Sequence, residues 1–283
     1  MSLVTLKTIL DEANAGNYAV PAFDVVDHAS AEAVVQAAEV QKRPVILMVP
    51  EAAFPLIDTK AFFSFLVRLA EGANVSVVLE LDHGQSFAGA MQVIHAGFSA
   101  VMIDGSALPH RENIALTKKI AEVAHAAGVS VEAEIGHVGG GEGSFEGSVV
   151  DESLYTKPED ARQFAEETGV DALAVAIGTV HGVYKGTPKL DLDRLAEIKQ
   201  CVSVPLVLHG GSGLSDADFR AAIAGGINKI NLFTEISMAA VAQSLEYCKQ
   251  RDNRLHFAEL VLAGQKAVRE IAFRYLELFG QKR

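Results

Sequence analysis

The chain has 283 residues, 49% of them apolar, and a formal net charge of −12. This length and apolar content suit one large domain, and we expect residues 1–283 to form a single domain. The acidic balance argues against nucleic acid or an anionic membrane as the main partner, but it does not exclude an anionic small molecule.

The two cysteines, Cys201 and Cys248, lie far apart and form no C-x-x-C pair, which favours a reducing compartment over a disulfide framework. No apolar run reaches the ~18 residues of a membrane span. The first residues lack a signal-peptide pattern. The sequence therefore predicts a soluble, cytoplasmic protein.

Short apolar, β-branched runs alternate with helix-period segments along the whole chain. The predicted strands are Tyr18–Phe23, Val45–Val49, Ser76–Leu81, Ala100–Ile103, Ser130–Ile135, Ala172–Ile177, Pro205–Leu208 and Lys229–Leu232. The helical segments include Ala29–Gln41, Arg111–Ala127, Pro158–Thr168, Asp191–Gln200 and Asp216–Ala224. Continuous apolar runs are typical of parallel strands that are buried on both faces. Repeated strand–helix units of this number predict an α/β fold, the (β/α)8 or TIM barrel.

A doubly wound open sheet is the structural alternative. Polar residues decide against it, because they follow the ends of many different strands rather than gathering at one switch point. These residues are Asp24, Asp82, His83, Asp104, Glu134, His209 and Asn231. Two segments exceed the repeat. Gly136–Lys157 has the length of a functional lid or of a disordered insertion. Glu235–Arg251 and Phe257–Phe279 predict extra C-terminal helices.

Three histidines follow three different predicted strands, and we expect them to meet at one rim of the barrel. They are His83, His181 and His209. Three neutral imidazoles leave the fourth position of a tetrahedral zinc ion open for substrate. For each histidine alone, a hydrogen bond at a strand end is an equally good explanation. Together, the three favour metal binding.

Glycines follow two of these histidines directly. Gly182 and Gly210 allow substrate and backbone to approach closely. The run Gly210-Gly211-Ser212-Gly213 leads into a helix that we expect Ser215 to cap, with Asp218 at capping-box spacing. A glycine loop after the seventh strand, opposite Asn231 and Thr234, is typical of a phosphate site. An ordinary tight turn is the alternative.

Carboxylates supply the remaining chemistry. Asp82 precedes a candidate ligand and is placed for proton transfer to or from a substrate oxygen. Glu132 and Glu134 alternate on one strand and so share a side, where charge is costly unless it is paired or near a metal. Glu142, on the glycine-rich segment, could act as a mobile base, although from its position alone a solvated loop acid is the better explanation.

These residues lie within longer motifs that resemble the class II ketose-bisphosphate aldolases, in particular the tagatose-bisphosphate and fructose-bisphosphate aldolase-like branch. The motifs span nearly the whole chain: Val20-Pro21-Ala22-Phe23, Leu81-Asp82-His83, Val101-Met102-Ile103-Asp104-Gly105-Ser106, Val131-Glu132-Ala133-Glu134-Ile135-Gly136, Ala174-Val175-Ala176-Ile177-Gly178-Thr179-Val180-His181-Gly182, His209-Gly210-Gly211-Ser212-Gly213 and Lys229-Ile230-Asn231.

The resemblance implies a metal-dependent aldehyde-lyase. It would reversibly cleave a ketose phosphate, such as tagatose- or fructose-1,6-bisphosphate, to dihydroxyacetone phosphate and an aldehyde through a zinc-stabilised enediolate. It implies one Zn²⁺ per subunit on His83, His181 and His209, with Glu134 near an alternate metal position. Asp82 and Glu142 would be the catalytic acid and base. Residues around the phosphate and a monovalent cation (Na⁺ or K⁺) would be Gly182, Gly210, Gly211, Ser212, Asn231 and Thr234. Family members are homodimers or homotetramers.

The chain departs from the family pattern at four positions. Asp24 replaces a usual asparagine, Gly84 a frequent histidine, Gly143 an acid and Phe233 a small or acidic residue. These changes leave the metal chemistry intact and raise an alternative, the same reaction with a different aldehyde partner.

Other hypotheses are a Schiff-base aldolase using Lys229, a metal hydrolase, and a non-catalytic sugar-phosphate-binding subunit. The first strand end carries no His-x-His, which disfavours the hydrolase. The intact Asp82 and three histidines disfavour the binding subunit.

Overall fold

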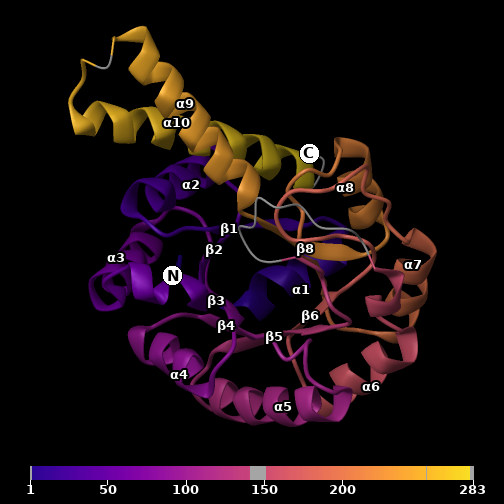
Figure 1. The fold of residues 1–283 in the computed structure, drawn as a ribbon. Coiled ribbons are helices and arrows are strands. Elements are labelled where there is room, and N and C mark those ends of the chain that lie inside the picture. The colour runs from indigo at the N-terminus through magenta and orange to yellow at the C-terminus, as the bar shows by residue number, and fades with distance from the viewer. Residues whose placement is uncertain (1, 141–150, 253, 281–283) are drawn as a thin grey trace.

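The computed structural model describes residues 2–140, 151–252 and 254–280. Eight parallel strands follow chain order around a closed barrel, in which β8 pairs with β1 (Figure 1). The strands are β1 Val20–Asp24, β2 Val45–Pro50, β3 Val77–Gly84, β4 Ala100–Ile103, β5 Ser130–Ile135, β6 Ala172–Val175, β7 Leu206–Leu208 and β8 Ile227–Leu232. The predicted α/β class and (β/α)8 barrel are confirmed.

Helices surround the strands and cover one end of the barrel. They are α1 Leu6–Gly16, α2 His28–Gln41, α3 Thr59–Gly72, α4 Phe87–Ala96, α5 His110–Ala126, α6 Pro158–Thr168, α7 Leu192–Cys201, α8 Asp216–Ala224, α9 Thr234–Gln250 and α10 Phe257–Phe279, with short 3-10 turns η1 Glu51–Leu56 and η2 Glu152–Leu154. No helix in these described ranges is long and apolar enough to cross a membrane.

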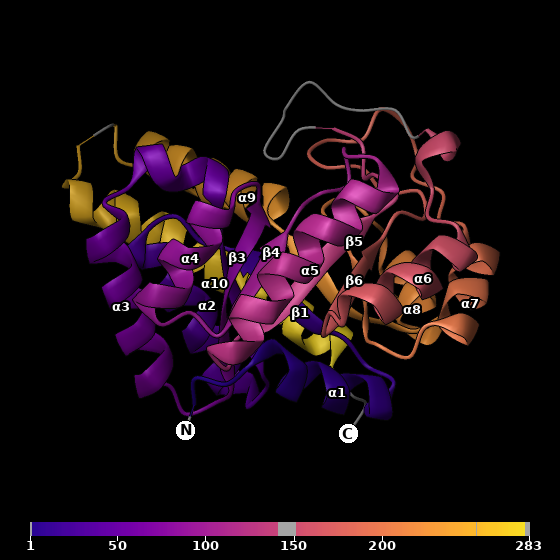
Figure 2. The same ribbon diagram turned by 90° about the horizontal axis from the view of Figure 1, so that it is seen from below.

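Two apolar layers hold the barrel together. Outward-facing strand residues pack against the surrounding helices in one large cluster. Inside the barrel, the helix α1 closes the end where the strands begin (Figure 2). Its Leu6, Ile9 and Leu10 are buried against inward-facing strand residues such as Val78 and Val207. The amino-terminal end is therefore plugged, which leaves the carboxyl ends of the strands as the open mouth.

The extra C-terminal helices form a hairpin that projects beside α2 (Figure 1). α10 then returns along the barrel, where Tyr275 and Phe279 are buried against Phe219 of α8. At its end, the carbonyl of Phe279 accepts a hydrogen bond from the N–H of Ala19. The predicted C-terminal extension is thus confirmed as two helices. The second of them is held at the end of the barrel where the strands begin.

Most predicted strand boundaries differ from the observed ones by one or two residues. Two of the differences lie at the mouth of the barrel. β3 runs to Gly84 rather than Leu81, so Asp82 and His83 lie within it. β6 ends at Val175 rather than Ile177. The predicted capping box at Ser215 and Asp218 is present at the start of α8.

Candidate active site at the mouth of the barrel

An irregularity in β3 brings two consecutive side chains to the mouth. In a regular strand, Asp82 and His83 would point to opposite faces. Instead the register with β4 shifts between Leu81 and Gly84, and His83 takes a φ of 42°. A histidine at positive φ is strained, and such strain is concentrated at functional sites. The turn ends at Gly84, where an added Cβ would lie 2.6 Å from the carbonyl oxygen of Met102.

The other two histidines stand on the loops that follow β6 and β7. The N–H of His181 donates to the carbonyl of Gly139, which fixes this loop against the segment after β5. His209 directly follows β7 and is fully buried. At Gly210, with φ of 65°, an added Cβ would lie 2.3 Å from the carbonyl oxygen of Val180, so the two loops touch through backbone.

The three imidazoles converge. Their ring centroids are 4.9 Å apart for His83 and His181, 4.7 Å for His83 and His209, and 5.9 Å for His181 and His209. One nitrogen from each lies within 4.8 Å of the others, close enough for a single ion to contact all three. The expectation that these histidines meet at one mouth therefore agrees with the geometry.

Carboxylates contact the ring nitrogens of two of these histidines. Oδ2 of Asp104 lies 2.8 Å from Nδ1 of His83, and Oε1 of Glu132 lies 3.0 Å from Nε2 of His209. These contacts orient the rings. The second nitrogen of His209, Nδ1, lies 3.1 Å from Oε2 of Glu134. Nε2 of His181 is buried without a hydrogen-bond partner among the described residues. Such a set of buried nitrogens fits a divalent cation and zinc in particular.

Protonation in the metal-free site differs between two of the rings. Burial lowers the pKa of His181 to about 4. Burial also opposes charge on His209, but hydrogen bonds to Glu132 and Glu134 outweigh it and raise its pKa to about 9. Burial opposes ionisation of Asp104 as well, yet His83 and the Ser106 hydrogen bonds hold the pKa of this carboxyl well below its usual range. The metal-free site thus carries charge on His209 and on its acidic neighbours.

Lys229 belongs to an ion cluster beneath the histidines. Its Nζ lies 2.7 Å from Glu132 and 2.8 Å from Glu80, and all three side chains are fully buried. Burial opposes the charge on Lys229, but the carboxylates Glu132 and Glu80 raise its pKa above the ordinary value. A Schiff-base nucleophile must be a neutral amine. The Schiff-base alternative is therefore disfavoured by the environment of this lysine.

Two further acids border the cluster. Oδ1 of Asp82 accepts a hydrogen bond from the amide of Asn231 at 3.1 Å. Oε2 of Glu134 lies 3.1 Å from Nδ1 of His209. His83, Asp104 and Glu134 also form a second group whose ligand atoms are mutually within 4.8 Å. Glu134 thus lies where an alternate ion position would be, together with Asp104, to which the sequence analysis gave no role.

The predicted phosphate residues lie together. Gly182, Gly210, Gly211, Ser212, Asn231 and Thr234 all line one cleft of about 390 Å³ that also contains Asp82, His83 and His181. The helix α9 begins at Thr234, and its N-cap residue Phe233 makes no side-chain cap. The N–H of Glu235 donates to the hydroxyl of Ser212 instead. Uncapped N–H groups at a helix start attract anions.

Apolar side chains also line the cleft, and most of them were not predicted. They include Val26, Ala53, Leu56 and Ile57, together with Phe233, which the sequence analysis named as a departure from the family pattern. Leu56 and Ile57 lie at the end of η1, a turn with no hydrophobic periodicity, so only their exposure in the folded chain reveals them. Asp24, one of the departures from the family pattern, also lines the cleft and is 7% exposed.

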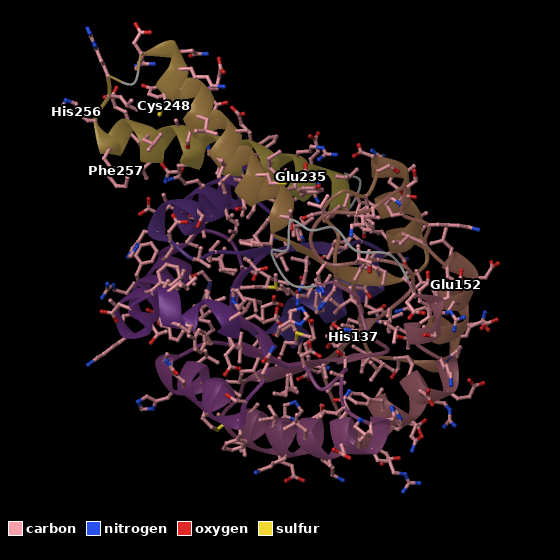
Figure 3. All side chains as sticks on the ribbon, viewed as in Figure 1. His137, Glu152, Glu235, Cys248, His256 and Phe257 are labelled. Carbon is pink, nitrogen blue, oxygen red and sulfur yellow. The ribbon has the colours of Figure 1, made fainter. Side chains whose placement is uncertain are left out.

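A hydrogen-bonded chain leads from the cluster towards the loops around it. The N–H of Ser106 donates to Asp104, and the Ser106 hydroxyl lies 3.0 Å from Nδ1 of His137. Figure 3 labels His137 at the mouth.

The predicted mobile base, Glu142, and the departure at Gly143 lie outside the described residues.

Comparison with known proteins shows which family and which solved structures this chain resembles. The family model for class-II fructose-bisphosphate aldolase matches residues 4–283. The YdjI aldolase from Escherichia coli K12, which has a crystal structure, shares 35% sequence identity with this chain. The two structures match with a TM-score of 0.88 over 99% of this chain and 98% of that one. Fructose-bisphosphate aldolase from Campylobacter jejuni shares the fold, with 23% identity and a TM-score of 0.83 over 98% and 95% of the two chains.

Proposed function

Because the chain belongs to the class-II fructose-bisphosphate aldolase family, we propose that it reversibly cleaves a ketose phosphate to dihydroxyacetone phosphate and an aldehyde, with a divalent metal ion on His83, His181 and His209. The observation that carries the proposal is the convergence of these three imidazoles beside Asp82 in one cleft. We treat residues 1–283 as one catalytic domain.

The metal site is proposed from its donor set. His83 and His209 are oriented by carboxylates, and His181 offers a buried nitrogen. Zinc suits three neutral nitrogens and an open fourth position. When bound, the cation supplies positive charge that stabilises negative charge developing on a substrate oxygen. Glu134 and Asp104 would hold the ion at an alternate position.

Carboxylate side chains of this protein would transfer the protons of the reaction. In the synthetic direction a proton leaves the hydroxylated carbon of dihydroxyacetone phosphate, that carbon bonds to the aldehyde carbon, and the aldehyde oxygen gains a proton. Asp82, held by Asn231, is placed to protonate that oxygen. Glu142 as the base at carbon remains a prediction.

The phosphate of dihydroxyacetone phosphate would bind at the glycine end of the cleft. The start of α9 and the loops at Gly182 and Gly210 provide backbone groups there, beside Ser212 and Thr234. A monovalent cation, Na⁺ or K⁺, at this end remains a prediction from the family resemblance.

We also propose that the chain forms a homodimer or homotetramer through the α9–α10 hairpin. Large apolar side chains on the hairpin are exposed, including Val241 and Leu245 at 56%, Leu262 at 60% and Phe257 at 78%. An apolar groove of about 410 Å³, which Val241 and Leu245 help to line, runs between the hairpin and the start of α2. Figure 3 shows Phe257 and Cys248 near the tip. Contiguous apolar surface of this kind is typical of protein contacts.

A metal and turnover assay tests the function. The purified protein should contain about one zinc per chain, release dihydroxyacetone phosphate from a ketose phosphate, and lose this activity in chelator. Metal without turnover on any ketose phosphate would instead support the non-catalytic sugar-phosphate-binding subunit. Activity that persists in chelator, with a borohydride-trapped adduct, would support the Schiff-base mechanism.

A further inference from the structure

The cleft over the histidine cluster has two ends of different chemistry. The glycine end, at Ser212 and Thr234, presents backbone groups and the start of α9. The side away from the loops after β6 and β7 is formed by η1, which follows β2, with Leu56 and Ile57 lining it. Leu56 is 85% exposed, so its side chain is available to a ligand. A substrate that spans the cluster places one end at each of these surfaces.

No positive side chain lines the described part of this cleft. Its titratable lining residues are Asp24, Asp82, His83 and His181, and no lysine or arginine is among them. Residues 141–150, which lie outside the described ranges, contain no lysine or arginine in the sequence.

The backbone donors at the apolar end are also unsuited to a second phosphate. The carboxylate of Glu51 accepts hydrogen bonds from the N–H groups of Gln85 and Ser86, at 2.6 and 3.2 Å, and from the Ser86 hydroxyl. It therefore occupies the start of α4, where an anion would otherwise bind. Pro50 lines the cleft and has no N–H to donate.

A phosphate dianion at this end would meet apolar side chains and the carboxyl group of Asp24, and no lysine or arginine is among the described residues that line the cleft. Burial of an uncompensated charge is strongly unfavourable, and proteins that bind phosphate supply cations or clustered N–H groups. An uncharged carbon chain has the opposite preference, because it gains contact with Leu56 and Ile57. Its hydroxyl groups can donate to Asp24.

We propose that the aldehyde partner carries no phosphate, so that the substrate is a ketose 1-phosphate whose far end is uncharged and rests on Leu56 and Ile57. The proposal rests on the aldolase function proposed above and specifies its substrate class. It replaces tagatose- or fructose-1,6-bisphosphate, which the sequence resemblance suggested. Leu56 and Ile57 are then residues that determine specificity.

Two measurements with the zinc-loaded protein test the proposal. The first follows deuterium exchange into dihydroxyacetone phosphate by NMR without any aldehyde, and therefore reports on the aldolase function alone. The second compares kcat/KM for condensation of dihydroxyacetone phosphate with glyceraldehyde and with glyceraldehyde 3-phosphate, which differ only in the phosphate. We expect exchange, and a preference of at least about tenfold for glyceraldehyde.

A charge-introducing variant locates the aldehyde end. Leu56→Lys should shift the kcat/KM ratio towards glyceraldehyde 3-phosphate by about tenfold or more, because it adds the missing cation. Val40→Lys, at another exposed apolar residue on α2, should leave the ratio unchanged.

Each unfavourable result has a distinct meaning. Absence of exchange would overturn the aldolase function and this proposal with it. Exchange with a preference for glyceraldehyde 3-phosphate would overturn this proposal alone, including the case in which a second copy of the chain supplies a cation. An unchanged ratio in Leu56→Lys would overturn the placement of the aldehyde end at η1.

Discussion

Nε2 of His209 lies 3.0 Å from Oε1 of Glu132, and neither side chain is exposed to solvent. The N–H at Nε2 therefore donates to Glu132, and Nδ1, which lies 3.1 Å from Oε2 of Glu134, is the nitrogen that would bind the proposed metal ion. A carboxylate in this position fixes the tautomer of the ring and makes it a stronger ligand.

Glu132→Gln should weaken zinc binding by about 10- to 100-fold, because the amide keeps the size of the side chain but loses its charge. Zinc affinity is measured by competition with a chelator, with circular dichroism to verify the fold. Glu122→Gln, at an exposed position on α5, is the control and should bind zinc like the unmodified chain. Equal affinity in both variants would show that Glu132 does not orient the ligand.

Zinc binding should release about one proton at pH 7, because a ligand imidazole must be neutral. Glu132 and Glu134 overcome the effect of burial and raise the pKa of His209 to about 9, so this ring is charged at pH 7 in the metal-free protein. His181, whose pKa burial lowers to about 4, is already neutral there. Apparent zinc affinity should consequently rise from pH 7 to pH 9.

Calorimetry of zinc binding in two buffers with different ionisation enthalpies measures the released proton. The proton count should fall as the pH passes about 9, the pKa of His209. A count near zero at pH 7, or an affinity that does not change between pH 7 and pH 9, would contradict the assignment of His209 as the ring that loses a proton.

Lys229→Met should lower the free energy of unfolding by about 3–5 kcal/mol, because Glu80 and Glu132 would be left buried without their cation. Urea unfolding of the metal-free protein measures the change. The double variant Lys229→Met with Glu80→Gln should recover part of it. Lys199→Met, which removes a single hydrogen bond to Asn14, is the control, with an expected loss of about 1 kcal/mol. A Lys229→Met loss no larger than the control would mean that the buried carboxylates do not depend on this lysine.

Sequence pattern was enough to predict the barrel and the convergence of His83, His181 and His209, because parallel strands buried on both faces have long apolar runs and end at one rim. It could not predict how Asp82 and His83 reach that rim together. Their placement depends on the register shift against β4 and the positive φ of His83, which are tertiary features.

The carboxylates that contact the candidate metal ligands were harder to predict from the sequence. The alternation of Glu132 and Glu134 indicated a shared side, but their separate contacts with Nε2 and Nδ1 of His209 depend on the ring's rotamer. The apolar wall at Leu56 and Ile57 belongs to a short 3-10 turn, whose residues follow no helical or strand period.

Leu245→Glu on the α9–α10 hairpin should dissociate the proposed oligomer and raise its dissociation constant by about 100-fold or more, because it places a charge in an apolar contact. Light scattering coupled to gel filtration gives the mass. Leu108→Glu, at a 42% exposed residue outside the hairpin, is the control. If the unmodified chain is a monomer, or Leu245→Glu retains its assembly, the hairpin is not the interface.

Gly84→Ala should impair catalysis through the geometry of β3. The added Cβ would lie 2.6 Å from the carbonyl oxygen of Met102 and 2.7 Å from Cδ2 of Leu81. The carbonyl belongs to β4, which leads into Asp104, so relief of the contact must come from the Asp82–His83 turn. A displacement of about 1 Å at a catalytic group reduces kcat/KM by about 100-fold, and the strain should cost about 1–3 kcal/mol of stability.

Gly72→Ala provides the matched control for this substitution. At the end of α3, its added Cβ would meet nothing within 4 Å, so activity should be kept and helix stability slightly increased. Aldol cleavage, zinc affinity and urea unfolding are compared for both variants. A Gly84→Ala protein with unchanged kcat/KM would mean that the turn absorbs the methyl group without moving Asp82 or His83.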